Sequence, residues 1–210
     1  MRAQPGRLPW LPWIVLAAIL LAAGIVLILS PAEQTLGDVV KVVYAHVALS
    51  RAGAVLFYLA GLLGLAMLVR PGPRLDAAMR AAGWAGLALF TAGFLVSGVA
   101  QVLSWGGITW QEPRVAAGAN VLAVAVIVQV AGAWLAWPRA RALLHILLAA
   151  FQFWTSLRAP NVLHPGGAIS GSASSAIQFS NTVLLLLALA IGAWIVWMFS
   201  LYRPANLPRE

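Results

Sequence analysis

The stretch WLPWIVLAAILLAAGIVLIL, residues 10–29, contains no charged side chain and is long enough to cross a lipid bilayer as a single helix. Since an α-helix rises 1.5 Å per residue, about 20 apolar residues cross the roughly 30 Å of bilayer hydrocarbon. The whole chain has the same character: 62% of its residues are hydrophobic and 9% are charged. That leaves too little polar surface for a water-soluble globule, so we expect an integral membrane protein.

Five more segments resemble the first in length and apolar content. We therefore predict an all-α bundle of six transmembrane helices in which residues 1–210 form a single domain. The basic start, MRAQPGRLPW, is expected to precede a retained first helix rather than a cleaved signal peptide, because the apolar run after it is long and further spans follow. The predicted spans lie near residues 10–30, 41–69, 78–103, 115–137, 142–158 and 177–201.

The basic residues predict how the bundle is oriented, since Lys and Arg concentrate in cytoplasmic connections. With the N-terminus inside, only Lys41, Arg114 and Arg158 fall on the outer face. Both termini are thus expected in the cytoplasm, with the protein in the bacterial cytoplasmic (inner) membrane. The net charge of +8 then reflects this asymmetry rather than nucleic-acid binding. The inner side would hold Arg2, Arg7, Arg70, Arg74, Arg80, Arg139, Arg141, Arg203 and Arg209.

Some kinds of chemistry are excluded by composition and spacing. The chain has no cysteine, so it cannot run a thiol–disulfide relay or attach haem through thioether bonds. No phosphate-binding, zinc-protease or hydrolytic motif is present, and we expect no enzymatic activity. Gly93 and Ser97 form a small-xxx-small pair, which is typical of helix packing.

Two of the three histidines are predicted to lie on the outer face. His46, in VVKVVYAHVALSR (residues 39–51), follows Lys41 by five residues, and His164 lies in the last outer connection, NVLHPGGAIS. Two neutral imidazoles can supply both axial ligands of a haem iron. A zinc site would need further ligands, which Glu33, Asp38 or Glu112 could provide. His145 lies near the opposite end of the fifth span and is expected to be structural.

The connection SWGGITWQEPR, residues 104–114, has two explanations. Trp105 and Trp110 could belong to the interfacial aromatic belt that membrane proteins commonly have. They could instead form an apolar platform for a porphyrin, whose propionates would pair with Arg114, Arg158 or Lys41. The spacing of these residues favours neither explanation.

Three segments together resemble the CcmC family, the haem-handling membrane subunits of bacterial cytochrome c maturation. They are PAEQTLGDVVKVVYAHV (31–47), SWGGITWQEPRV (104–115) and NVLHPGGAI (161–169), in the family's order and on one predicted face. The tryptophan-rich segment departs from the family pattern: Ile108, Thr109 and Gln111 replace tryptophans, and Glu112 replaces an aspartate.

The resemblance implies a specific function. His46 and His164 would be the axial ligands of non-covalently held haem b at the outer surface, and the chain would deliver haem to a haem chaperone for c-type cytochrome biogenesis. The family works beside the membrane subunit of an ABC transporter and a small single-span subunit, all within membrane lipid. By the same resemblance, the haem site and its docking surface would include Trp105, Trp110, Glu112 and Arg114.

Two alternatives stay open. An electron-transfer membrane anchor of cytochrome b type would hold haem between histidines deep in two spans. A transporter would show broken spans with charges near the bilayer midplane, for which Arg51 is the only hint. Arg51 and His46 are rotated by roughly 140° from each other on a helix. We expect Arg51 to pair with an outer carboxylate such as Glu112, or with a partner subunit.

Overall fold

The computed structural model describes residues 10–160, 162–163, 169 and 171–201. Within these residues the chain forms six long helices and no strand beyond one isolated bridge, so the predicted six-helix all-α architecture is confirmed. All six are long and apolar enough to cross a membrane. They are α1 (Leu11–Leu29), α2 (Val40–Val69), α3 (Pro73–Trp105), α4 (Pro113–Trp134), α5 (Pro138–Arg158) and α6 (Ser175–Leu201).

Prolines set three helix starts that the hydropathy pattern placed too late. α3 begins at Pro73 rather than near residue 78, and α5 begins at Pro138 rather than near residue 142. α4 begins at Pro113, two residues before the predicted start. A proline fits the first helical turn because the N–H that it lacks has no intrahelical partner there.

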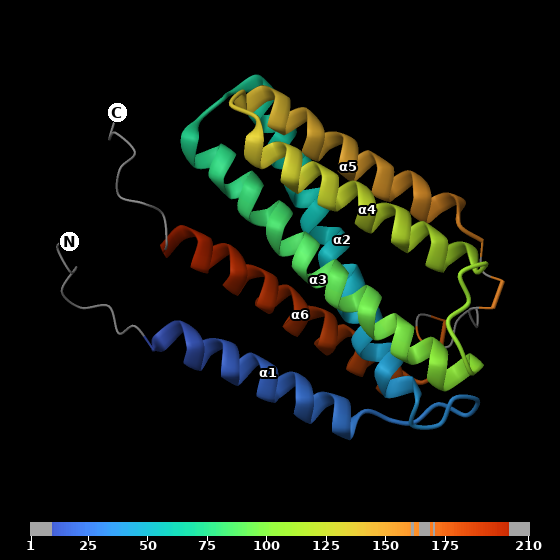
Figure 1. The fold of residues 1–210 in the computed structure, drawn as a ribbon. Coiled ribbons are helices and arrows are strands. Elements are labelled where there is room, and N and C mark those ends of the chain that lie inside the picture. The colour runs from blue at the N-terminus through green and yellow to red at the C-terminus, as the bar shows by residue number, and fades with distance from the viewer. Residues whose placement is uncertain (1–9, 161, 164–168, 170, 202–210) are drawn as a thin grey trace.

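Successive helices run in opposite directions, so their connections gather at two ends (Figure 1). The connections α1–α2, α3–α4 and α5–α6 lie at one end, which we call the His46 end. The two short connections, 70–72 and 135–137, lie at the other, which we call the Arg70 end. Among described residues, the predicted inner-side arginines 70, 74, 139 and 141 lie at or within a turn of helix termini at the Arg70 end. Which end faces the cytoplasm stays a prediction.

Helix α2 packs at the centre of the bundle, and glycines let its neighbours approach closely. A Cβ atom on Gly53 would lie 2.6 Å from the backbone nitrogen of Phe90 in α3, and one on Gly64 would lie 2.8 Å from the carbonyl oxygen of Ala142 in α5. Both distances are too short for a side chain. Small residues at such crossings are the usual means of bringing transmembrane helices together.

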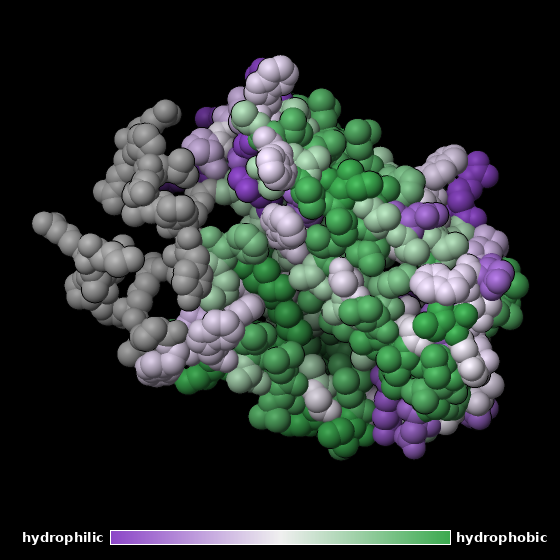
Figure 2. Space-filling view, in the orientation of Figure 1, coloured by the Kyte–Doolittle hydropathy of each residue, from purple (hydrophilic) through white to green (hydrophobic). Residues whose placement is uncertain are grey.

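Helix α1 lies at the edge of the bundle and packs mainly on α6 (Figure 1). The Trp13 and Trp194 rings are 5.5 Å apart between centroids, and the Trp194 indole donates a hydrogen bond of 2.7 Å to the Pro12 carbonyl. Figure 2 shows a predominantly hydrophobic face across the middle of the molecule, with hydrophilic residues towards its two ends. This distribution is that of a protein surrounded by lipid.

A mostly buried ion pair joins α3 and α5 at the Arg70 end. Arg141 of α5 donates two hydrogen bonds, of 3.0 and 2.9 Å, to the two carboxylate oxygens of Asp76 in the first turn of α3. A third guanidinium nitrogen of Arg141, Nη1, donates a hydrogen bond of 2.5 Å to the carbonyl oxygen of Leu135. The side chains are mostly buried, with 11% and 14% of their surface exposed. A bidentate pair of this kind fixes geometry as well as charge.

Candidate ligand site at the His46 end

His46 lies in the second turn of α2, half-buried against α3. Its Nδ1 atom is 2.9 Å from the carbonyl oxygen of Gly93, and the Ser50 hydroxyl lies 3.3 Å from the same nitrogen. Since a carbonyl oxygen can only accept, we infer that Nδ1 carries the proton and donates it to Gly93. The ring lone pair of the neutral imidazole is then on Nε2, so Nε2 is the nitrogen that could ligate a metal.

The close contact between α2 and α3 makes this hydrogen bond feasible. A Cβ atom on Gly93 would lie 2.6 Å from the backbone nitrogen of Ser50, so only glycine fits at this crossing without displacing a helix. The small-xxx-small pair correctly indicated packing at Gly93. It carried no signal that the Gly93 carbonyl would orient a histidine 47 residues away.

The connection between α3 and α4 is tied back onto α3. Gly106, with φ of 77°, ends the helix directly after Trp105 in the left-handed conformation that glycine adopts without strain. The buried Gln101 side chain then accepts a hydrogen bond of 3.1 Å from the backbone N–H of Thr109. The loop that carries the proposed haem-binding residues therefore has a defined path.

Glu112 joins this loop to the connection between α5 and α6. Its side chain is 1% exposed, and its Oε2 atom accepts a hydrogen bond of 2.9 Å from the backbone N–H of Leu163. Glu112 also stands at the N-cap position of α4, where the helix dipole favours a negative charge. The sequence placed Glu112 beside the site but did not indicate which group its carboxylate binds.

The second predicted ligand, His164, lies outside the described residues. The described residues nearest to it on each side are both anchored. Leu163 is held by Glu112, and Ile169 is buried in a core cluster that includes Val40 and Tyr44 in the first two turns of α2. The connection that contains His164 is therefore fastened both to the α3–α4 loop and beside the start of the helix that carries His46.

The other predicted site residues differ in exposure. Trp105 is half-buried at the end of α3, whereas Trp110 is 58% exposed. Arg114 is exposed, and among the described residues it has no hydrogen-bonding or ion-pair partner. Lys41 is already engaged with Asp38 at 2.9 Å and with the carbonyl of Ile28 at 3.2 Å. Arg114 is thus accessible to an anion, whereas Lys41 is already engaged.

The acidic residues that could have completed a zinc site have other roles. The Glu33 carboxylate accepts backbone hydrogen bonds from Leu36 and Thr35, and these bonds lower the pKa of Glu33 below its usual value. Asp38 pairs with Lys41. No group of three or more histidine and carboxylate side chains that could hold a metal ion occurs among the residues that the structure describes.

The expected ion pair between Arg51 and Glu112 is not formed. Arg51 is exposed on α2, while Glu112 is buried and bound to Leu163. The sequence indicated correctly that Arg51 and His46 lie on different faces. It could not show that the Glu112 carboxylate binds the Leu163 backbone instead.

His145 is buried at 2% exposure and lies far from His46. The residue of α2 beside His145 is Gly61, since a Cβ atom on Gly61 would be 3.4 Å from the carbonyl oxygen of His145. Gly61 is about 22 Å from His46 along α2. Because metal–imidazole bonds are about 2 Å long, these two histidines cannot ligate one iron. His145 instead fills the hollow at Gly83 beside Gln129, consistent with a structural role.

No protein-family model and no curated protein sequence matches this chain. The likeness to the CcmC family therefore rests on the three sequence segments alone.

Proposed function

We propose that this chain is a haem-handling membrane protein that holds haem b at the His46 end and delivers it for c-type cytochrome biogenesis. His46 and His164 are the axial ligands, without covalent attachment. The observation that carries this proposal is the hydrogen bond from His46 Nδ1 to the Gly93 carbonyl, because it fixes the tautomer and makes Nε2 the ring nitrogen that can ligate a metal.

The remaining residues of the site fit haem chemically. The exposed Trp110 presents an indole face against which a flat apolar macrocycle can pack. Arg114 provides an accessible guanidinium for a propionate. Glu112 positions the chain segment just before His164 rather than touching haem itself.

This arrangement suits reversible binding. His46 is held by helix packing, whereas His164 belongs to a connection between helices, and we assign the opening step of haem transfer to the His164 side. The receiving partner is a haem chaperone, and the membrane subunit of an ABC transporter and a small single-span subunit accompany the protein. With the basic Arg70 end in the cytoplasm of a bacterial inner membrane, the haem site faces the periplasm.

The alternative of a cytochrome b anchor requires two histidines that face each other within the bundle. The separation of His46 from His145 argues against it.

The test is haem content and absorption spectrum of purified protein after haem loading, for wild type, His46→Ala, His164→Ala and the matched control His145→Gln. We expect each of the two alanine variants to lose most bound haem or to shift its spectrum, and the control to match wild type. Added imidazole should partly restore the spectra of His46→Gly and His164→Gly, which separates lost ligation from misfolding. Unchanged haem content and spectra in both alanine variants would refute the proposed ligands.

A further inference from the structure

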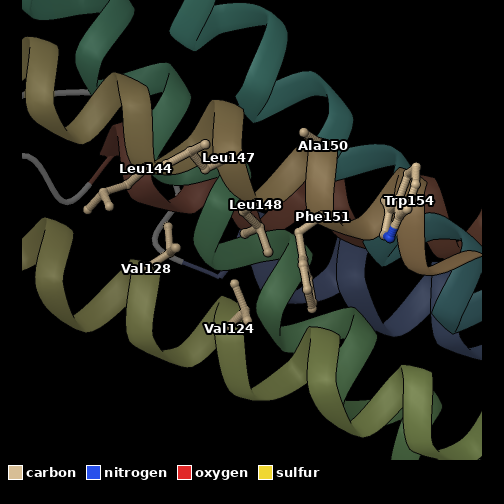
Figure 3. A pocket seen from close by; sticks show the side chains of 8 residues that line it. All are labelled: Val124, Val128, Leu144, Leu147, Leu148, Ala150, Phe151 and Trp154. Carbon is tan, nitrogen blue, oxygen red and sulfur yellow. The ribbon is translucent and has the colours of Figure 1, made fainter.

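An apolar groove runs along the surface between α4 and α5, and none of its lining residues belongs to the proposed haem site. Its volume is about 520 Å³, and it is lined by Val124 and Val128 of α4 and by Leu144, Leu147, Leu148, Ala150, Phe151 and Trp154 of α5. Figure 3 shows these side chains following the two helices, with Trp154 at the end nearest the C-terminus of α5. Apart from the indole N–H, no lining side chain carries a polar group.

A cation stands at the same end as Trp154. The guanidinium of Arg158, the last residue of α5, lies 4.5 Å from the centre of the Trp154 ring, in stacking range. Arg158 is exposed, and among the described residues no carboxylate pairs with it. Tryptophan and arginine together at the end of a transmembrane helix are typical of the level of the lipid headgroups.

The dimensions match one leaflet. From Leu144 to Trp154 the groove follows α5 for about 15 Å, which is half of the roughly 30 Å of hydrocarbon in a bilayer. A molecule that occupies the groove must therefore have an apolar part as long as one leaflet is thick. It must also carry a hydrogen-bond acceptor for the guanidinium of Arg158, at the end of α5.

The geometry points to a binding site for an anionic phospholipid of the leaflet at the His46 end. One acyl chain lies in the α4–α5 groove, and the phosphate, whose charge no headgroup cation neutralises, binds Arg158, which stacking on Trp154 holds in place. Arginine is suited to this role because its planar donors match phosphate oxygens in pairs. The haem proposal assigns a propionate to Arg114 and uses no residue of this lipid site.

The test is native mass spectrometry of delipidated protein titrated with phosphatidylglycerol or with phosphatidylcholine of the same acyl chains. We expect wild type to favour phosphatidylglycerol by about 5- to 10-fold, as one basic residue near the headgroups suggests. Arg158→Gln should abolish this preference, whereas Arg139→Gln, at the opposite end of α5, should keep it. Val124→Trp, which fills the groove, should weaken binding of both lipids.

A second measurement does not depend on variants. Phosphatidylglycerol with a photoreactive group midway along an acyl chain should label wild-type peptides from 121–134 and 142–158 above all others. Equal labelling of all helices would overturn the proposal. So would an unchanged preference in Arg158→Gln, an equal loss in Arg139→Gln, or undiminished binding to a folded Val124→Trp variant.

Discussion

Replacing Gly93 with alanine should weaken haem binding through a residue that never touches haem. The new Cβ atom would lie 2.6 Å from the Ser50 backbone nitrogen, whereas ordinary van der Waals contact begins near 3.4 Å. Relieving the overlap requires α2 and α3 to separate by about 0.8 Å. The hydrogen bond from His46 to the Gly93 carbonyl would then lengthen from 2.9 Å to about 3.7 Å, beyond hydrogen-bonding range.

The expected size of the effect follows from the loss of this orienting bond. Removing the partner that fixes the tautomer of a ligating histidine typically lowers metal affinity by about 10- to 100-fold. We expect a loss in that range for Gly93→Ala, measured by titrating purified protein with haem and following its absorption. The crowding itself should reduce stability by about 1–3 kcal/mol.

Gly98 of the same helix offers a matched control. A Cβ atom on Gly98 would meet only the Ile108 side chain, at 3.9 Å, so Gly98→Ala should fold normally and bind haem as wild type does. Wild-type haem affinity in Gly93→Ala would refute the role assigned to the Gly93 carbonyl. Equal losses in both variants would mean that added bulk on α3, rather than the hydrogen bond, determines binding.

Three further predictions concern other contacts. Glu112→Ala should speed haem transfer to an acceptor apoprotein by about 10-fold, because a charged hydrogen bond that anchors the neighbouring connection is lost. Glu112→Gln, which keeps a hydrogen-bond acceptor, should change the transfer rate less. Equal rates in the wild type and both variants would contradict this. Asp76→Asn should destabilise the detergent-solubilised protein by about 3 kcal/mol, measured by thermal unfolding, because it leaves the mostly buried Arg141 with a neutral partner. The control Asp38→Asn, in an exposed ion pair, should have little effect. Backbone donors lower the pKa of Glu33, so they stabilise the turn at residues 33–37 fully above the usual carboxyl pKa. That contribution is lost as the pH falls from the usual pKa through the lowered one. Glu33→Gln should remove this acid dependence, measured by hydrogen exchange of the turn amides.

The sequence predicted the spans well because the bilayer leaves an apolar segment few choices other than a helix. It also placed His46 on a different face from Arg51, since that depends only on helical periodicity. It did not predict the partners of His46 and Glu112, which are 47 and 51 residues away along the chain. Such contacts depend on how the helices are rotated and spaced. For α2 and α3, the spacing depends on Gly93, and a hydropathy profile does not distinguish Gly93 from its neighbours.

The two proposed ligands belong to different kinds of segment, a helix for His46 and a connection between helices for His164, and this difference bears on haem release. His46 belongs to a helix whose contact with α3 cannot loosen without repacking the bundle, so its imidazole is preorganised. At the start of the connection that carries His164, the contact between described residues is the hydrogen bond from Leu163 to Glu112. A bond of that kind contributes about 1.5–3 kcal/mol, which is small enough for a docking partner to offset. If the protein delivers haem, exchange should therefore begin on the His164 side, while His46 keeps the iron in place until the acceptor supplies its own ligand.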